Sequence, residues 1–494
     1  MVPLVRVVVV NFNGGPLTLR CLRSLEATHW PSDRLELVLV DNGSQDGVAA
    51  TAAKHHPRVR VLESQANLGF GGGCNLGLRN LGDVDYVALV NNDATVSPNW
   101  LRPLVTTLST DASLGAACPK ILFAPSFVDL ALETSAAPPG WGDRRHLGVR
   151  VSGLRVGEQD RWRQTLLLSG FWGPEHGEGD EPSYQWTGPA ASMRVPLVPG
   201  EPVPYFTWLR MAADVDKAVT LQSSLENVKV SVGRRPEWFR APLQGSPYDV
   251  INNVGSQLVG GSYGSDRGFL EADRGQYDEP ADVFAWCGGA VLLSRRYLDD
   301  VGQFDGRLFL YYEDLDLAWR GRNRGWRYQY VPDSVVRHVH SASSDKASSL
   351  FAFYNERNRL LTLARNSSGR RATTAAVRSL LITASYARRD VVSRLLRRRS
   401  PSFRIVGVRL RAFASFLRLL PGTLQLRAGD RLRGPRWWEH RPHPRSAGSE
   451  PDRRKAISSA SISVRASRRD TWRERLMHTN SRKSRATVKS RVGP

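Results

Sequence analysis

VRVVVVNFNG, residues 5–14, decides the fold class, because five valines run directly into two asparagines. Short β-branched runs of this kind recur along the first quarter of the chain, and segments with helical spacing separate them. The predicted strands are Val5–Val10, Leu35–Val40, Val59–Leu62 and Tyr86–Val90, and the predicted helices are Leu17–Leu25, Gly47–His55 and Gly71–Leu81. This alternation is typical of an α/β domain built on a parallel sheet.

Polar side chains gather where the four predicted strands end. In an open parallel sheet, ligands bind outside the carboxyl ends of the strands. Because Asp, Asn and Gly also dominate turns, each of these residues taken alone has a turn-only interpretation. Four polar strand ends on one rim indicate a ligand site instead. The residues are Asn11 and Asn13 after the first strand, Asp41 after the second, Asn67 after the third, and Asn91, Asn92 and Asp93 after the fourth.

The 494-residue chain has the composition of a folded protein with a basic end. Hydrophobic residues make up 41% and charged residues 23%, which excludes a mostly unstructured chain. The formal net charge is +22, but residues 365–494 hold 33 Lys and Arg against 7 Asp and Glu, whereas residues 1–364 have a net charge of −4. Function therefore has to be considered separately for the two parts.

Changes in composition and in hydrophobic periodicity divide the chain into regions. After the first α/β stretch, short apolar runs broken by Gly and Pro predict an inserted, sandwich-like all-β domain. Strand and helix character then returns, so the segments on either side of the insert are predicted to form one α/β domain. Arginine-studded amphipathic helices follow, and then a disordered tail rich in Ser, Arg and Lys. These regions are 1–124 with 249–364, 125–248, 365–440 and 441–494.

Cysteine spacing and hydropathy indicate the compartment. The four cysteines lie far apart and lack metal-ligand spacing, which favours a reducing environment. The N-terminal apolar run is too short for a signal peptide. No apolar stretch approaches the ~18–20 residues that span a bilayer. We therefore expect a cytoplasmic protein, either soluble or bound to the inner face of a membrane.

The glycine-rich stretch NLGFGGGCN, Asn67–Asn75, is a helix start and not a dinucleotide fingerprint. Counted from Gly69 or from Gly71, the third glycine position of the fingerprint falls on another residue type. The chain also has no GxxxxGK[ST] motif. Free N–H groups at such a helix start suit an anion or a close backbone approach, and helix-to-sheet packing is an equally good interpretation.

The stretch FLYYEDLDLAWR contains three carboxylates inside an apolar frame. Asp316 and Arg320 stand at i, i+4, which predicts a structural ion pair. Glu313 and Asp314 follow two tyrosines, and carboxylates shielded by rings can hold a pKa suited to general-base work. Further on, His338 follows a predicted strand. A lone histidine is more often structural, but with Asp93 nearby the two could share a divalent cation.

Seven stretches, in this order, resemble glycosyltransferase family 2, and within it the bacterial rhamnosyltransferase-like branch. They cover about residues 4–124 and 250–364, and as a set they are specific. The stretches are VVVVNFNG, LVLVDNGSQDG, NLGFGGGCNLGL, YVALVNNDATVSPNWL, WCGGAVLLSRRYL, GQFDGRLFLYYEDLDLAWRGRNRGWRYQYVPDSVVRHVHSASS and FYNERNRL. The resemblance implies the GT-A fold, in which a Rossmann-like half binds a nucleotide sugar.

The resemblance also implies roles for individual residues. Asp314 looks like the catalytic base, with Glu313 as a neighbour that orients or tunes it. Asp93 and His338 look like ligands of Mg²⁺ or Mn²⁺ on the donor diphosphate. Asn91 stands where the family's DxD motif has its first acid, so it offers hydrogen bonds without charge. The residues expected to line the donor pocket are Asn11, Asp41, Asn67, Gly71, Asn75, Asn91 and Asn92.

The expected reaction is an inverting transfer from a nucleotide sugar to a glycan of the cell envelope or of a polysaccharide. The resemblance favours dTDP-rhamnose as the donor, with UDP-galactofuranose as the alternative. A different class of function is a non-catalytic scaffold that binds glycan or membrane. For the tail, arginine alternating with apolar residues favours an anionic membrane surface and a lipid-linked acceptor over nucleic acid.

For the tryptophans of the insert, a small β core that needs aromatic residues is favoured over a carbohydrate-binding face.

Overall fold

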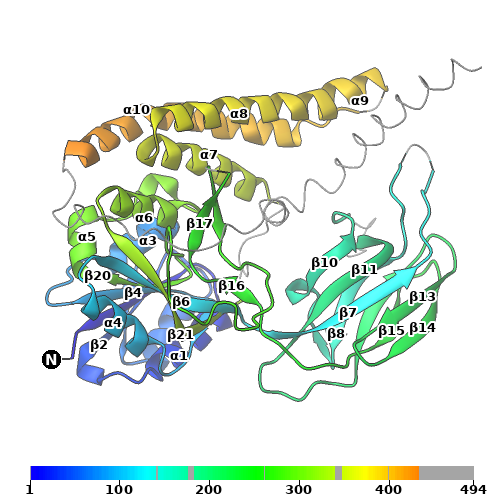
Figure 1. Cartoon of the computed structure of the whole chain (residues 1–494), viewed down its shortest axis with the longest axis horizontal. Helices are drawn as coiled ribbons and strands as arrows, with labels where there is room; N and C mark the ends of the chain where they lie inside the picture. The colour runs from blue at the N-terminus through cyan, green and yellow to red at the C-terminus, as the bar shows by residue number, and fades with distance from the viewer. Residues whose placement is uncertain are drawn as a thin grey trace, which may run out of the picture. The chain divides into compact units, whose positions relative to one another are not determined.

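The computed structural model describes residues 2–140, 143–175, 183–260, 262–339, 348–398 and 400–432 (Figure 1). The expectation of a disordered tail over 441–494 lies outside the described residues. The described residues form two compact units, of which 2–125 with 249–432 make the first and 126–248 the second. Each unit has its own hydrophobic core.

The first unit is built on a ten-stranded mixed sheet. Its strands are β1 (Val5–Asn11), β2 (Leu35–Asp41), β3 (Val59–Glu63), β4 (Tyr86–Asn91), β5 (Ala94–Val96), β6 (Leu114–Phe123), β16 (Ile251–Asn253), β19 (Ala281–Asp282), β20 (Ala290–Ser294) and β21 (Arg327–His338). The order along the sheet is β19-β21-β6-β20-β4-β1-β2-β3, with β16 on β6 and β5 on β21. Strands β1 to β4 are mutually parallel, which confirms the predicted α/β class.

Helices cover both faces of this sheet. One face packs on α1, α2 and α4 through an aliphatic core, and the other face packs on α3, α5 and α6. The helices are α1 (Pro16–Glu26), α2 (Val48–His55), α3 (Gly69–Gly77), α4 (Leu101–Thr110), α5 (Arg295–Val301) and α6 (Glu313–Asn323). Because both faces are covered, the strands are buried on both sides and read as continuous apolar runs.

Helix α3 ends earlier than the predicted Leu81. The guanidinium group of Arg6, which is buried in the sheet, donates hydrogen bonds to the carbonyls of Arg79 (2.8 Å) and Asn80 (3.1 Å). Asn80 has a φ of +52°, so the chain turns there and cannot continue as a helix. A buried arginine on a neighbouring strand therefore ends the helix, and helical periodicity does not report such a contact.

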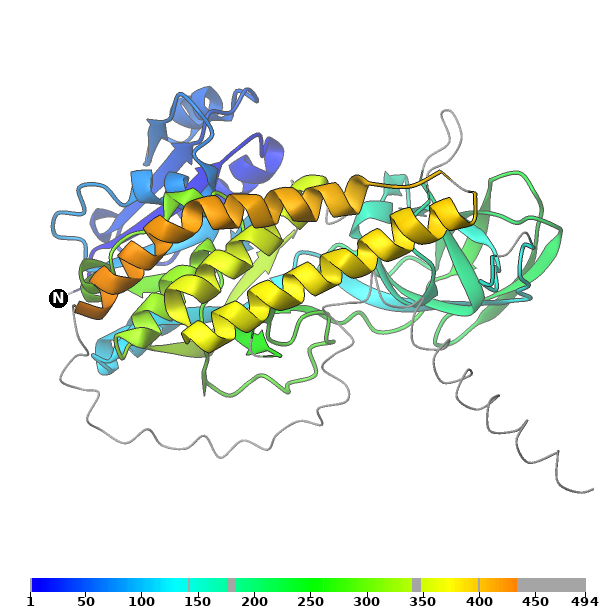
Figure 2. The same cartoon turned by 90° about the horizontal axis from the view of Figure 1, so that it is seen from above.

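Four further helical segments complete the first unit. They are α7 (Ser349–Asn366), α8 (Gly369–Ala387), α9 (Ser393–Leu396) and α10 (Arg404–Leu432). Helix α7 packs on α6, and α8 and α10 pack on α7. Figure 2 shows α8 and α10 lying alongside each other above the rest of the unit. Within the described part of the chain, no helix has the length and hydropathy needed to cross a membrane.

The second unit consists of two antiparallel sheets joined by one long strand. The strands are β7 (Ser126–Thr134), β8 (Arg150–Val156), β9 (Gln159–Asp160), β10 (Leu166–Phe171), β11 (Gln185–Leu197), β12 (Phe206–Ala212), β13 (Lys217–Gln222), β14 (Asn227–Val232) and β15 (Glu237–Pro242). The beginning of β11 pairs with β8, and its remainder pairs with β7 and β10. One core receives side chains from both sheets, as in a sandwich.

The core of the second unit is aliphatic, contrary to the expectation for its tryptophans. Its fully buried side chains are Val, Leu, Met and Ala. The tryptophans at positions 162, 172, 186, 208 and 238 are only partly buried. Arginines lie over three of them, with Arg155 4.3 Å from the Trp238 ring centre. Alternating β-branched and leucine side chains fill the space between the sheets, so the expectation that tryptophans build this core is wrong for the described residues.

Candidate functional site

The polar ends of β1, β2 and β4 form one hydrogen-bonded network. Asn11 is fully buried, and its side-chain amide donates to Ser44 Oγ (3.0 Å) and lies 3.4 Å from Asp41 Oδ1. Its carbonyl oxygen accepts from Thr18 (2.7 Å) and from Asn92 (3.2 Å). Strands β1 and β2 pair with Asn11 opposite Asp41. The register of the parallel strands therefore brings these predicted residues together at the rim.

The segment after β2 is fastened to the glycine-rich loop by Asn42. Its side chain donates to Asn67 Oδ1 (3.1 Å) and to the Gly69 carbonyl (3.0 Å), and it accepts from Leu68 N–H (2.9 Å). Asn67 also caps the loop by accepting from Gly69 N–H (2.8 Å). The sequence places Asn42 in the polar turn after the second predicted strand but assigns it no role.

The glycines of α3 allow close backbone approach on two sides. A Cβ added at Gly69, where φ is +74°, would lie 2.1 Å from the Phe309 carbonyl, and a Cβ at Gly73 would lie 2.6 Å from Val10. Gly71 faces Phe304 and the Cβ of Glu313. The loop thus packs between the sheet and residues 304–313. The glycines serve both a close backbone approach, at Phe309, and helix-to-sheet packing, at Val10.

Asn75 joins the same two regions. Its side-chain amide donates to the Phe304 carbonyl (3.0 Å) and its oxygen accepts from Phe304 N–H (3.0 Å). Both polar groups of the side chain are therefore engaged within the protein, and Asn75 holds α3 to the segment that precedes α6. We therefore assign Asn75 a structural role in place of the expected contact with the donor.

Asp93 and His338 lie side by side. His338 Nε2 is 2.9 Å from Asp93 Oδ1 and 3.3 Å from the side-chain nitrogen of Asn91. The other ring nitrogen, Nδ1, lies 3.2 Å from the carbonyl oxygen of Asn252, which is an acceptor only, so Nδ1 donates this hydrogen bond. Asn252 therefore fixes the ring so that Nε2 faces Asp93. Strands β5 and β21 pair here, which places Ala94 opposite His338.

At the start of α6, Glu313 is buried and Asp314 is partly buried. Burial raises the pKa of Asp314, and the N–H groups of Gly288 (2.9 Å) and Leu315 (2.7 Å) oppose this by donating to its oxygens. Burial, and then the charge of Asp314, raise the pKa of Glu313 well above its ordinary value. Oε2 of Glu313 is buried and has no partner among the described residues.

Asp316 has the structural role predicted for it. Its carboxylate pairs with Arg320 at 3.0 Å, and both side chains are almost fully buried. Arg365 and Asn366 of α7 also contact the Asp316 carboxylate, at 3.4 and 2.7 Å. The third acid of the motif thus anchors α6 to α7.

Gly288 and Gly289 connect Asp314 with the Asp93–His338 pair. Gly288 N–H donates to Asp314, while the next residue, Gly289, accepts from Asn91 N–H at 3.0 Å. A Cβ added at Gly289 would lie 3.7 Å from the His338 ring. Consecutive Cα atoms are only about 3.8 Å apart. The Asp314 carboxylate and the Asp93–His338 pair therefore lie on the same rim of the sheet.

The chain enters α6 through a strained segment. Phe309, Tyr311 and Tyr312 all have φ between +64° and +71°, which bulky residues rarely adopt. Asn358 of α7 is fully buried, and its side-chain nitrogen lies within 2.8 Å of the carbonyls of Leu308, Leu310 and Tyr311. Strain of this kind clusters at functional sites when the surroundings enforce it. Asn358 is a positioning residue for the two acids.

Sequence reasoning missed Asn252 and Asn358, and the signal for both was weak. Asn252 stands in DVINNVG and Asn358 in FYNERNRL, and neither stretch by itself assigns its asparagine a role. Only the fold shows that Asn252 supports a histidine 86 residues away and that Asn358 supports a loop about 47 residues away. The FYNERNRL stretch contributed to the family resemblance, but its role is visible only in three dimensions.

Comparison with known proteins agrees with this arrangement. The family model described as glycosyl transferase family 2 matches residues 6–126, and a second, described as glycosyltransferase like family 2, matches residues 271–360. By these matches the protein is a glycosyltransferase that is similar to family 2 in both stretches. The two matches fall on either side of the second unit and cover the strand ends, the glycine pair, the acids and His338.

Individual relatives were found in bacteria and archaea. The glycosyltransferase is 26% identical to N-acetylglucosaminyl-diphospho-decaprenol L-rhamnosyltransferase of Mycobacterium tuberculosis over 359 residues, which are 72% of this chain and 82% of that protein. It is also 26% identical over 110 residues to glycosyltransferase AglE of Haloferax volcanii, across 22% of this chain and 36% of that protein. Both relatives are named as enzymes that transfer a sugar.

Two solved structures align at low scores. GalNAc-T7 with UDP, GalNAc and Mn²⁺ aligns with a TM-score of 0.38 and 14% identity, over 74% of this chain and 48% of that one. Mannosyltransferase PcManGT from Pyrobaculum calidifontis, in complex with GDP-Man and Mn²⁺, aligns with a TM-score of 0.35 and 13% identity, over 97% and 85%. The fold of the first unit is the GT-A fold.

Replacing Asn358 with alanine should lower kcat more than it changes KM for the donor. The three carbonyls lose their donor, residues 308–312 relax, and the acids move, which costs on the order of 10²-fold in rate for a displacement of about 1 Å. Steady-state kinetics would measure this. Asn355→Ala is the matched control, because Asn355 lies on the same helix and its side-chain nitrogen has no partner among the described residues. Equal loss of activity in both variants would contradict the positioning role.

Replacing Glu313 with glutamine should remove a pH-dependent loss of stability. Because its folded pKa is raised, Glu313 stabilises the protein fully below its unfolded pKa of about 4.3, and this stabilisation is lost as pH rises through the folded pKa. Between about pH 5 and 8, the free energy of unfolding of the wild type should fall relative to that of the variant. Urea unfolding followed by the helical circular dichroism signal measures this. Glu63→Gln, at an exposed carboxylate, should leave the profile unchanged.

Proposed function

We propose that the glycosyltransferase performs an inverting transfer in which Asp314 is the catalytic base. The observation that carries the proposal is the contact of consecutive residues, Gly288 and Gly289, with Asp314 on one side and with Asn91 and His338 on the other. A base and a diphosphate-binding pair on one rim suit an in-line displacement. The acceptor hydroxyl would lose its proton to Asp314 as its oxygen attacks the anomeric carbon, and the bond to the nucleoside diphosphate would break.

The surroundings of Asp314 suit this task. A general base works best when its pKa approaches the working pH, and burial raises the pKa of Asp314 in that direction. The N–H groups of Gly288 and Leu315 fix both carboxylate oxygens. Glu313 is buried beside Asp314, and a neutral Glu313 adds no repulsion to the ionised base. The two acids thus have different roles set by their environments.

The network at the ends of β1 and β2 supports a nucleotide pocket. Asp41 is buried to more than nine-tenths, yet among the described residues its carboxylate has only a long side-chain contact, 3.4 Å from Asn11. Its carboxylate is an acceptor for the N–H groups of a nucleobase. Asn11, Asn67, Gly71, Asn91 and Asn92 line or brace the same rim. We assign Asp41 to base recognition on this ground.

Asp93 and His338 fit a divalent cation. A carboxylate oxygen and an imidazole nitrogen face the same point, and Asn252 holds the ring in the orientation that a ligand needs. Within the described ranges, no group of three or more His, Cys, Asp or Glu side chains forms a metal cage. Mg²⁺ or Mn²⁺ would therefore take its other ligands from phosphate oxygens and water. When bound, such an ion supplies neutralisation of charge on the departing diphosphate.

For the substrates, we propose dTDP-rhamnose as the donor and an N-acetylglucosaminyl diphosphate carried by a lipid as the acceptor. The support is the activity that names the mycobacterial relative, which aligns over 82% of its length. A lipid-linked acceptor also suits a protein whose helices α8 to α10 expose apolar side chains beside arginines. A screen of nucleotide sugars, including UDP-galactofuranose, for thermal stabilisation would test the donor, because a ligand of the native state raises stability.

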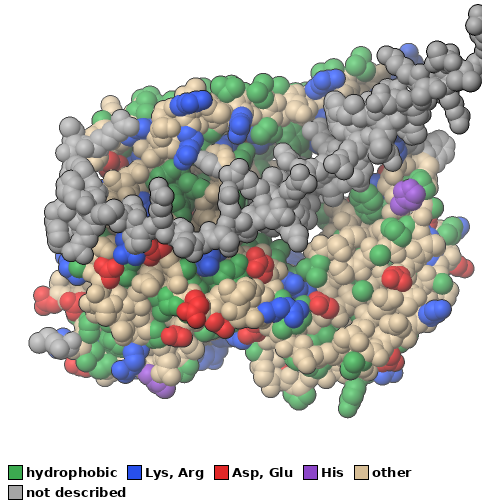
Figure 3. All heavy atoms as spheres, in the orientation of Figure 1, with side chains coloured by type: hydrophobic (Ala, Val, Ile, Leu, Met, Phe, Trp, Pro, Cys, Tyr) green, Lys and Arg blue, Asp and Glu red, His purple; other side chains and the backbone are tan. Residues whose placement is uncertain are grey.

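We also propose that α8, α9 and α10 lie on an anionic membrane surface. These helices expose large apolar side chains beside arginines, and Figure 3 shows green hydrophobic and blue basic side chains together over α8 and α10. Apolar side chains insert at the acyl boundary while arginines contact anionic headgroups. The exposed large apolar residues of these helices are Val377, Leu380, Leu381, Ile382, Leu395, Leu396, Ile405, Leu410, Leu417, Leu424 and Leu426.

Replacing Asp314 with asparagine should reduce turnover on the order of 10²–10⁴-fold, because the amide cannot accept the proton but can still accept from Gly288 N–H. Donor binding should stay unchanged when measured by calorimetry. Asp299→Asn, at an exposed acid of α5, is the control and should retain full turnover. A wild type with no turnover of any nucleotide sugar would favour the scaffold interpretation, and a fully active Asp314→Asn variant would exclude Asp314 as the base.

His338→Ala and Asp93→Asn should each weaken Mn²⁺ binding to the protein with the donor nucleotide bound. Electron paramagnetic resonance of free Mn²⁺ measures this without turnover. Asn252→Ala should weaken binding by about 10-fold to 100-fold, since it frees the histidine ring. His55→Ala, at an exposed histidine of α2, is the control. Unchanged Mn²⁺ affinity in the first two variants would overturn the assignment.

A further inference from the structure

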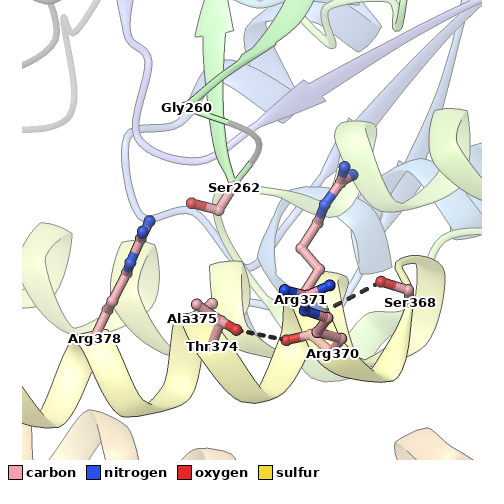
Figure 4. A pocket seen from close by; sticks show the side chains of 8 residues that line it. All are labelled: Gly260, Ser262, Ser368, Arg370, Arg371, Thr374, Ala375 and Arg378. Atoms are coloured by element: carbon pink, nitrogen blue, oxygen red, sulfur yellow. Dashed lines mark hydrogen bonds between the residues drawn. The ribbon is translucent and has the colours of Figure 1, made fainter.

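The first unit has a cavity away from Glu313 and Asp314, between a hairpin and the start of α8. The hairpin consists of β17 (Ser256–Val259) and β18 (Tyr263–Asp266). The cavity measures about 420 Å³, which is large enough for more than a single phosphate. Figure 4 shows Arg371 and Arg378 extending from α8 on either side of Ser262. Hydroxyls and guanidinium groups make up its polar lining.

The arginines of this cavity have no acidic partner in the described part of the chain. No ion pair is formed by Arg370, Arg371 or Arg378 there. Other arginines of the same helical region differ. Arg365 pairs with Asp305, Asp316 and Asp430, and Arg409 pairs with Glu356. Three cations that face one cavity repel each other unless an anion lies between them.

Ser262 offers a second kind of group to a ligand. The residue is only 8% exposed, yet its Oγ is not one of the fully buried, unpartnered polar atoms of the described residues. Its hydroxyl is therefore open to the cavity, where it can donate a hydrogen bond to a bound anion. Figure 4 shows the Ser262 side chain directed into the space between the two arginines.

The start of α8 adds donors of the same kind. Ser368 caps this 19-residue helix by accepting from Arg371 N–H at 3.3 Å. The free N–H groups and the positive end of the helix dipole favour an anion at this position. Guanidinium groups, hydroxyls and a helix start together are the chemistry that recognises phosphate oxygens.

We propose that this cavity binds the diphosphate group of the acceptor. The proposal rests on the lipid-linked acceptor of the proposed function and deepens it. A diphosphate carries enough charge to balance the three arginines, and the cavity volume leaves room for the groups on either side of it. The same chemistry would accept free pyrophosphate or an anionic phospholipid headgroup, and the experiment separates these sources.

The hairpin links this cavity to the acids. Gly264 lies two residues after Ser262, which is about 7 Å along an extended strand. Its N–H donates to the Tyr312 hydroxyl at 3.3 Å, and Tyr312 directly precedes Glu313. The other wall is α8, whose later residues Leu380 and Leu381 expose apolar side chains. An acceptor anchored here would direct its sugar to Asp314 and its lipid chain along α8.

Two variants of the full-length enzyme test the proposal against a matched control. Arg371→Ala with Arg378→Ala removes two cavity charges, and Ser262→Ala removes only a hydroxyl. Arg58→Ala with Arg102→Ala removes two exposed charges of the first unit outside the cavity and outside helices α8 to α10. Both cavity variants should raise KM for an N-acetylglucosaminyl diphosphate lipid, about tenfold or more for the double variant. The KM for the donor, and KM for a neutral N-acetylglucosaminyl alkyl acceptor, should not change, and the control should resemble the wild type.

Binding experiments identify the source of the anion. Inorganic pyrophosphate, titrated by calorimetry without divalent cations, should bind the wild type and the control but not the double cavity variant. Vesicles of phosphatidylcholine with phosphatidylglycerol should bind the wild type and Ser262→Ala equally. If the cavity variants lose vesicle binding but keep KM for the diphosphate lipid, the cavity is a headgroup site and the proposal is overturned. Identical pyrophosphate binding in all variants overturns it as well.

The failure of this proposal and of the proposed function can be told apart. If the wild type does not use the diphosphate lipid at all, the proposed acceptor is wrong, while the pyrophosphate titration still decides whether the cavity binds a diphosphate.

Discussion

The placement of two adjacent carboxyl groups, the buried Glu313 and the partly buried Asp314, is the constraint on which the catalytic unit depends. An ionised carboxylate in an apolar setting is costly unless donors reach it. Backbone N–H groups of Gly288 and Leu315 reach Asp314, and nothing among the described residues reaches Oε2 of Glu313. Asp314 is thus prepared to be charged and Glu313 to be neutral. This difference arises from backbone placement and not from residue type.

That placement requires help from distant parts of the chain. Gly288 reaches Asp314 because β20, the next strand, lies between β4 and β6 in the sheet. The left-handed residues before α6 persist because Asn358 on α7 holds three of their carbonyls, and Arg357 holds those of Arg307 and Leu308 at 2.8 and 3.0 Å. Helix α7 in turn is tied to α6 through Asp316. The acids are therefore held by contacts that form only when the second half of the unit is folded.

Much of the fold could be predicted because its signals are local. The four parallel strands follow from valine-rich runs, and their polar ends from the residues that terminate them. The sequence could suggest a pairing of Asp93 with His338 only on the condition that the two residues lie close together. They are 245 positions apart in the chain, and sequence spacing does not show whether such residues are in contact. The early end of α3 and the roles of Asn252 and Asn358 depend on single side chains that cross between elements. Helical or strand periodicity cannot show such contacts.

The arginines of the C-terminal helices show how structure separates two uses of one residue type. In the sequence they form one basic region, and net charge favours an anionic partner for all of them. In the structure, Arg365 and Arg409 are neutralised by buried or partly buried acids and therefore hold α7, α8 and α10 together. Arg371 and Arg378, in the first and third turns of α8, face a cavity that Ser262 also lines. Charge that is balanced inside the protein stabilises the fold, and only the remaining charge is available for a ligand or a membrane.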